Sequence, residues 1–98
     1  MILNLPTKID FGAIKFGQSY TKEYIIKNTH SSVIQITDIG RSCSCTEVSM
    51  NGKSILQPNE STSIKVTITP GSTGIFSRSF WFKINGQSYT VTLLGHAS

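Results

Sequence analysis

Segments in which apolar and polar residues alternate run through most of the chain, and turn-forming residues separate them. The clearest segment covers 61–69, where Ile64, Val66 and Ile68 alternate with polar side chains. A period of two residues places every second side chain on one face of a β-strand, so these three are expected to point into a core. Comparable segments cover 19–28, 33–39, 45–49, 75–84 and 87–94. The pattern predicts an all-β protein.

The same alternation predicts which side chains share the apolar face of each strand. They are Tyr24, Ile26, Ile34, Ile36, Phe76, Phe80, Phe82, Ile84, Tyr89, Val91 and Leu93. Arg78 falls on this apolar side near the start of its strand, whereas Trp81 falls on the opposite side.

Glycine and proline mark kinks and turns. Gly12 is predicted to kink the first strand, Gly17 to form the turn after it, and Pro58 to lead a turn before the strand at 61–69. The segment 70–74, which ends in Gly74, is the strongest break in the chain. The residues expected to fix the fold are Gly12, Gly17, Cys43, Cys45, Pro58 and Gly74.

Two Asn-Gly pairs, at 51–52 and 85–86, suit tight hairpin turns with positive φ. Asp38 and Gly40 are predicted to end the strand that starts near residue 33, and 95–98 to form a tail.

The 98 residues suffice for one domain, covering 1–98. About seven or eight short strands with turns at regular spacing predict a single immunoglobulin-like antiparallel β-sandwich. Antibody-type domains pair two distant cysteines, but Cys43 and Cys45 are separated by one residue, which excludes that disulfide.

Cys43 and Cys45 are the candidate reactive groups. A tetrahedral metal needs three or four protein ligands, and only His30 and His96 could join the two thiols, at no motif spacing. A disulfide between residues i and i+2 of a strand is badly strained. The cysteines are therefore predicted to be architectural, with metal or redox chemistry and an intermolecular disulfide as alternatives. No cofactor is predicted.

Trp81, Tyr20 and Tyr89 are each candidates for either the core or an interface, since exposed aromatic side chains often dominate binding energy. Lys53 lies in a loop that could contact a partner. Trp81 is flanked by polar residues, which makes its strand a predicted contact surface.

The charge pattern does not favour nucleic acid. The net charge is +4, but the nine lysine and arginine residues are spaced along the whole chain, whereas nucleic-acid binders concentrate theirs on one face. No nucleophile, phosphate-loop or metalloprotease motif is present, so an enzyme is not predicted. Neither a signal peptide nor a membrane-spanning apolar run is visible in the sequence.

Several motifs occur in a characteristic order along nearly the whole chain. They are Phe11-Gly12, Gly17, 24–28, Cys43-Ser44-Cys45-Thr46, 56–60, Gly74 and Leu94-Gly95. This order resembles that of bacterial or phage immunoglobulin-like domains with a Cys-Gly-Cys-Thr signature, which are related to the ASH domain of ciliary and centrosomal proteins and to the major sperm protein fold. Ser44 and Asn59 stand where that pattern usually has glycine. The resemblance implies a seven-stranded sandwich with a non-catalytic role in assembly.

The sequence therefore predicts a structural or interaction protein that docks on a larger assembly. The most specific hypothesis is a phage capsid decoration protein, whose partners would be the major capsid protein or copies of itself, located in the virion or the cytoplasm. One alternative is a domain of a longer bacterial or ciliary scaffold. Another is a thiol-dependent metal-binding module.

Overall fold

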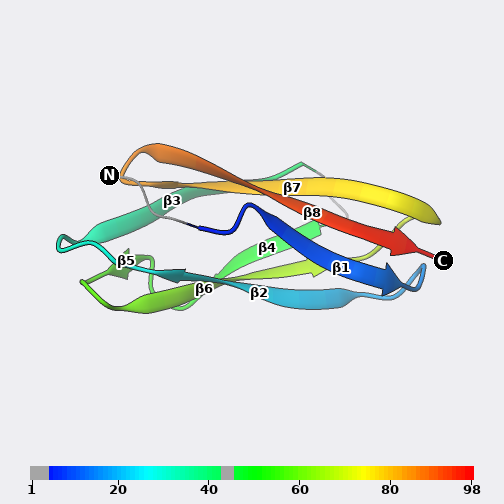
Figure 1. The fold of residues 1–98 in the computed structure, drawn as a ribbon, viewed down its shortest axis with the longest axis horizontal. Helices are drawn as coiled ribbons and strands as arrows, with labels where there is room; N and C mark the ends of the chain where they lie inside the picture. The colour runs from blue at the N-terminus through cyan, green and yellow to red at the C-terminus, as the bar shows by residue number, and fades with distance from the viewer. Residues whose placement is uncertain (1–4, 43–45) are drawn as a thin grey trace.

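The computed structural model of the chain describes residues 5–42 and 46–98. It contains eight strands in two sheets that face each other (Figure 1). The five-stranded sheet has the order β1 (Lys8–Ile14), β8 (Gln87–Ala97), β7 (Gly74–Ile84), β3 (Ile34–Arg41), β5 (Ile55–Leu56). The three-stranded sheet has the order β2 (Tyr20–Lys27), β6 (Ser61–Ile68), β4 (Thr46–Asn51). The all-β immunoglobulin-like sandwich predicted from the alternation is confirmed.

The core fills the space between the sheets with the side chains that the alternation placed inside. Phe80, Phe82, Ile26 and Ile64 are fully buried, and the ring of Tyr24 meets that of Phe80 edge-on at 5.5 Å. Burial of each large apolar side chain contributes about 1.5–3 kcal/mol. The other buried apolar side chains are Phe11, Ile14, Tyr24, Ile34, Ile36, Leu56, Val66, Ile68, Ile84, Val91, Leu93 and Ala97.

One pair of strands is parallel, which the expected antiparallel sandwich did not include. β1 pairs with β8 in parallel, while β7 pairs with the other edge of β8 in antiparallel. Both β1 and β7 pair with β8 as far as Ala97. Residues 95–97 therefore belong to β8, and the predicted tail at 95–98 is wrong. His96, for example, is paired with both Ala13 and Ile75.

Positive φ angles occur at the predicted kinks and turns. Gly12 has a φ of 68° and lies at a shift of register between Asp10 and Ala13 of β1. Asn85 (φ 49°) and Gly86 (φ 85°) join two strands whose last pair is Ile84 and Gln87, so the predicted hairpin is confirmed. Before β6, Glu60 N donates to Gln57 O (3.0 Å) across the turn that Pro58 leads.

Two further local predictions are wrong. Asn51-Gly52 does not form a hairpin: β4 pairs with β6 and β5 pairs with β3, so the chain passes there from one sheet to the other. Asp38 and Gly40 do not end β3 but form an irregularity within it, where Asp38 adopts a φ of 55° and the register with β7 shifts. Pairing with β7 continues to Arg41, which extends the strand beyond the predicted end.

Candidate functional site

The outer face of the five-stranded sheet carries the chain's single tryptophan. On β7 the buried side chains of Phe80 and Phe82 point inward, so Trp81 between them points outward and is 39% exposed. The alternative in which Trp81 belongs to the core is therefore wrong. Its neighbours on this face include Ser79 and Lys83, each two residues away on the same strand, and Thr90, its partner on β8.

The position of Trp81 depends on Gly40. The irregularity at Asp38 in β3 places Gly40 opposite Trp81. A Cβ atom at Gly40 would lie 2.2 Å from the indole Nε1 and 2.6 Å from Cε2, well inside van der Waals contact. The indole therefore occupies the space that a side chain at position 40 would need, and it lies against the backbone of β3.

An ion pair lies beside this site. Lys83 Nζ is 3.9 Å from Asp38 Oδ2, and both side chains are largely exposed. Exposed pairs of this kind contribute about 0–1 kcal/mol, so the pair tunes the charge of the face more than the stability of the fold.

Tyr20 and Tyr89 do not share a surface with Trp81. Tyr89 stacks on Phe82 at 5.5 Å, on the inner side of the sheet. Tyr20 belongs to the other sheet and packs at the margin of the core. Its hydroxyl accepts a hydrogen bond from Lys15 N at 3.0 Å.

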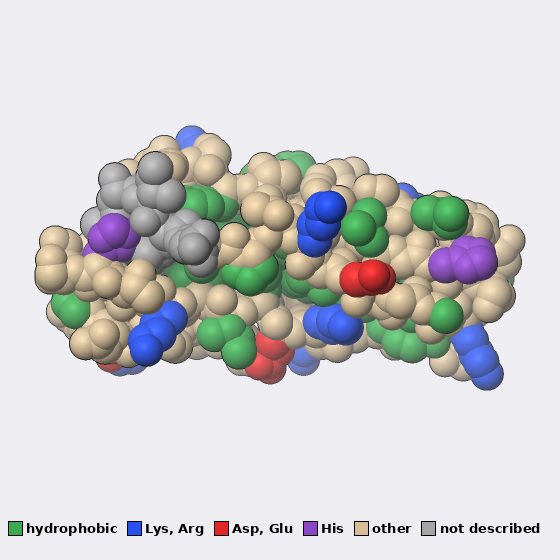
Figure 2. Space-filling model, in the orientation of Figure 1, with side chains coloured by type: hydrophobic (Ala, Val, Ile, Leu, Met, Phe, Trp, Pro, Cys, Tyr) green, Lys and Arg blue, Asp and Glu red, His purple; other side chains and the backbone are tan. Residues whose placement is uncertain are grey.

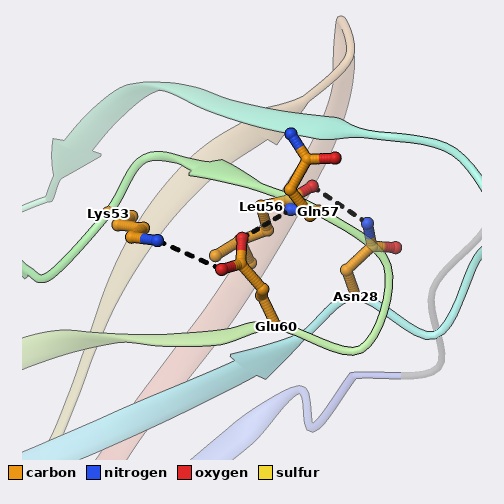
Figure 3. Close-up of polar contacts among 5 residues, drawn as sticks. All are labelled: Asn28, Lys53, Leu56, Gln57 and Glu60. Atoms are coloured by element: carbon orange, nitrogen blue, oxygen red, sulfur yellow. Dashed lines mark hydrogen bonds and ion pairs between the residues drawn. The ribbon is translucent and has the colours of Figure 1, made fainter.

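Lys53 belongs to a separate corner of the molecule, where it forms an ion pair with Glu60 (Figure 3). Lys53 Nζ lies 3.1 Å from Glu60 Oε2, and Gln57 N donates to Glu60 Oε1 at 2.8 Å. The Gln57 backbone bond, and then Lys53, lower the pKa of the Glu60 carboxyl. These contacts of Glu60 hold the turn before β6 in place. The predicted interface residues Lys53, Tyr20 and Tyr89 therefore do not share a surface with Trp81.

Asn28 is an important residue that the alternation of side chains placed only at the end of the strand predicted at 19–28. It is fully buried, and its side-chain amide donates to Ser32 O (2.8 Å) and Leu56 O (3.1 Å), the second of which Figure 3 shows. Its Oδ1 accepts from His30 N at 3.0 Å, the local bond typical of asparagine at a turn. An asparagine directly after an apolar strand was the signal for this role.

Cys43 and Cys45 lie outside the described residues, so their role stays a prediction. Elsewhere in the chain, residues 5–42 and 46–98 contain no group of three or more side chains that could hold a metal ion. Histidine side chains lie near opposite ends of the face that Figure 2 shows.

Basic side chains are not gathered on one surface. On the face that Figure 2 shows, lysine and arginine side chains are spread along the length of the molecule, with acidic side chains among them. They occur on strands of both sheets, for example Lys8 on β1 and Lys65 on β6. In the ranges 5–42 and 46–98 no helix is long and apolar enough for a membrane span.

Comparisons with known proteins identify the family and the fold. Residues 1–96 match the model of the HYDIN/CFA65/VesB-like, Ig-like domain. No curated protein matches the chain. Among solved structures, a protein of unknown function from Porphyromonas gingivalis W83 is similar, with a TM-score of 0.83 and 13% identity over 95% of this chain and 45% of that one.

Two further structures share the fold. The ASH/PapD-like domain 7 of human CEP192 has a TM-score of 0.76 and 9% identity, over 95% of this chain and 82% of that one. The VesB protease of Vibrio cholerae has a TM-score of 0.73 and 17% identity, over 95% of this chain and 30% of that one.

These identities are low enough that the likeness is one of fold alone. The chain spans less than half of the Porphyromonas and Vibrio structures. The resemblance to ASH domains is confirmed at the level of the fold, whereas the Cys-x-Cys-Thr signature and a phage origin stay predictions. The chain belongs to the HYDIN/CFA65/VesB-like, Ig-like domain family.

Proposed function

We propose that the chain is a non-catalytic immunoglobulin-like module that binds a neighbouring protein in a larger assembly through the outer face around Trp81. The observation that carries this proposal is that the indole of Trp81 packs against Gly40. The indole fills the space that a side chain at position 40 would need, and yet the ring stays partly exposed. A core would bury such a ring fully.

The geometry suits an interface. Binding residues that are already held in place lose little conformational entropy when a partner docks, and tryptophan is among the residues that contribute most to binding. The small side chains of Ser79 and Thr90 allow a partner surface to approach the indole closely.

The context of the module is proposed from its family. Relatives of similar fold include parts of longer chains, and the chain spans only 30% of the VesB protease structure. We therefore favour a domain of a longer scaffold over a complete enzyme. The protease activity in the name of that relative supports nothing for this chain, which covers a part of it.

Capsid decoration, with the major capsid protein or copies of the chain as partners, stays a prediction from sequence, as do the virion and cytoplasmic locations. Mass spectrometry of purified particles tests it, and absence of the chain from them would end the hypothesis.

Photo-cross-linking in the cells of origin tests the proposed face. A photoreactive amino acid replaces Thr90, beside Trp81, or Lys65, on the outer face of the other sheet, in the full-length protein. We expect a discrete cross-linked protein from position 90 only, which disappears when Trp81→Ala is added. Equal products from both positions, or no effect of Trp81→Ala, would refute the proposal.

A further inference from the structure

β2 forms a long and regular edge of the three-stranded sheet. Its eight residues all pair with β6 without a shift of register, from Tyr20 with Ile68 to Lys27 with Ser61. Natural edge strands are usually short, bent by a bulge or blocked by proline, because their free N–H and C=O groups invite another strand to pair. None of these three features is present in β2.

The other edges differ from β2. β5 has only two residues, and β1 carries the shift of register at Gly12. β4 is regular, but Glu47 is its single charged side chain, so it offers no pair of opposite charges to a second strand. Of the edges that the structure describes, β2 is therefore the one best suited to pair with another strand.

The backbone of β2 offers hydrogen-bonding groups at every second residue. Asn28 N, directly after β2, donates toward β6, to Glu60 O at 2.9 Å. The direction of these groups alternates along an antiparallel strand, so those of Lys27, Ile25 and Glu23 point away from β6. In the described part of the chain, no strand pairs with that side of β2.

The side chains of the same residues lie on the outer face of the sheet, because Tyr24 points into the core. Ile25 is large and apolar and yet 64% exposed, and its partner on β6 is the small Ser63. Glu23 and Lys27 lie two residues to either side of it and have opposite charges. The outer row of β2 therefore consists of an acidic, an apolar and a basic side chain, with Ile25 at its centre.

The lysines of β2 do not block this edge. A lysine at an edge usually repels a second strand. Lys22 Nζ, however, donates to Asp10 O of β1 at 3.0 Å, so its charge is held toward the other sheet. Lys27 would meet an acidic side chain if a second β2 ran in the opposite direction, since Glu23 lies four residues before it.

We propose that two copies of the chain pair through β2, antiparallel, with Ile25 of one copy opposite Ile25 of the other. This register places Glu23 of each copy opposite Lys27 of the other, so both charge pairs are attractive. A register shifted by two residues would instead place Ile25 opposite a charged side chain. A two-fold axis relates the copies, and their three-stranded sheets join into one continuous sheet.

The pairing goes beyond the proposed function and does not depend on it. Trp81 lies on β7 in the other sheet, so a partner protein at that face and a second copy at β2 bind without competition. Lys65 belongs to the central strand β6 and is not part of the edge. An edge contact is at the low end of specific interfaces in size, so we expect a dimer that dissociates on dilution.

Sedimentation equilibrium of the purified chain, from micromolar to millimolar concentration, tests the pairing. We expect the mass to rise toward that of two chains. Glu23→Lys or Lys27→Glu should weaken association by about tenfold or more, because each change places like charges opposite one another at both ends of the contact. Glu47→Lys, on β4 of the same sheet, is the matched control and should leave association unchanged.

A mixture of the two charge variants tests the register. Glu23→Lys and Lys27→Glu chains should each associate weakly alone and form a mixed dimer together, because every introduced charge then faces an opposite one. A chain that stays monomeric at millimolar concentration would overturn the proposal. So would equal association of all variants, or a mixture that associates no better than its components.

The backbone contact has its own measurement. The Ile25 N–H is free in one chain and bonded in the pair, so its hydrogen exchange should slow as the concentration rises; an exchange rate independent of concentration would contradict the pairing. Ile25→Pro should abolish association, since proline is tolerated where an edge N–H faces solvent but offers no donor to a second strand. If Ile25→Pro does not fold, the mixture of charge variants decides alone.

Discussion

The side-chain amide of Asn28 donates to the carbonyl oxygen of Leu56 at 3.1 Å and so joins the two sheets. Asn28 directly follows β2 of the three-stranded sheet, and Leu56 ends β5 of the five-stranded sheet. Both residues are fully buried. The backbone of Asn28 is also fixed, because Asn28 N donates to Glu60 O at 2.9 Å and so continues the pairing of β2 with β6 beyond Lys27 and Ser61. One buried amide therefore connects two edges that have no ladder in common.

Replacement of Asn28 by alanine is expected to lower the free energy of unfolding by about 3 kcal/mol, because three hydrogen bonds of its side chain are lost and the Leu56 carbonyl is left buried without that donor. Urea denaturation measures the change. Asn51→Ala is the matched control, since the Asn51 amide makes an exposed 3.3 Å bond to Glu23, and it should cost less than about 0.5 kcal/mol. Equal losses in the two variants would contradict the role assigned to Asn28.

The lowered pKa of Glu60 predicts a dependence of stability on acid. The Gln57 N–H and, to a smaller extent, Lys53 stabilise the charged carboxylate in the folded protein, so its pKa lies below the ordinary value of 4.5. A carboxyl of this kind stabilises the fold above its unfolded pKa, and the contribution is lost as the pH falls through the folded pKa. We expect the midpoint of urea unfolding to fall below about pH 4.5.

Two variants separate the causes. Glu60→Gln should flatten the acid dependence, because its side chain does not titrate. NMR titration of the Glu60 carboxyl in Lys53→Met should show a pKa that is still lowered, since the backbone bond from Gln57 is the larger cause. A return of the pKa to its ordinary value in Lys53→Met would show that the ion pair dominates instead.

Sequence alone predicted the features that depend on nearest neighbours. A period of two residues placed Ile64 and Val66 of β6 in the core, and the buried row of β7 followed the same rule, with Arg78 as its visible exception. The hairpin at Asn85-Gly86 was predicted correctly, because asparagine and glycine tolerate the positive φ angles that the turn itself requires. Local rules are sufficient for which side of a strand each residue faces, and for a hairpin between two strands that follow each other in the chain.

The same rules failed where the partner is distant. Asn51-Gly52 has the composition of a hairpin, but β4 pairs with β6, so the turn connects two sheets. His96 reads as part of a tail until β1 and β7 provide partners on both sides. The packing of Trp81 against Gly40 depends on an irregularity in β3. The hydrogen bond from the Asn28 side chain reaches the Leu56 carbonyl, 28 positions away in the chain. None of these contacts leaves a periodic trace in the sequence.

Tyr24 predicts a dependence on alkali. Its hydroxyl donates to Pro6 O at 2.5 Å, and burial, with a smaller effect of Tyr89, raises the pKa of Tyr24 to about 12. Stability from this group is fully present below the unfolded pKa of 10.0 and declines as the pH rises toward 12.

Absorbance titration at alkaline pH should therefore show one tyrosine that ionises near 12, and Tyr24→Phe should remove that step. Stability measured across the same range by urea should decline less steeply in Tyr24→Phe than in the unaltered protein. A late step that persists in the variant would assign the raised pKa to another tyrosine.

A methyl group at position 40 is expected to displace the indole of Trp81. The added Cβ would lie 2.2 Å from Nε1, so Gly40→Ala should move the ring into solvent and cost about 1–3 kcal/mol of stability. Trp81 is the only tryptophan in the chain, so a shift of its emission to longer wavelength reports the movement directly.

Two comparisons make this result specific. Gly71→Ala is the control, because nothing lies within 4 Å of a Cβ there, and both emission and stability should stay unchanged. In a Trp81→Ala background the cost of Gly40→Ala should largely disappear, since the atoms that it meets are gone. If Gly40→Ala lowers the stability by the same amount with and without the indole, the glycine is needed for the backbone conformation of β3 instead. The absence of a side chain at position 40 would then not be explained by the packing of Trp81.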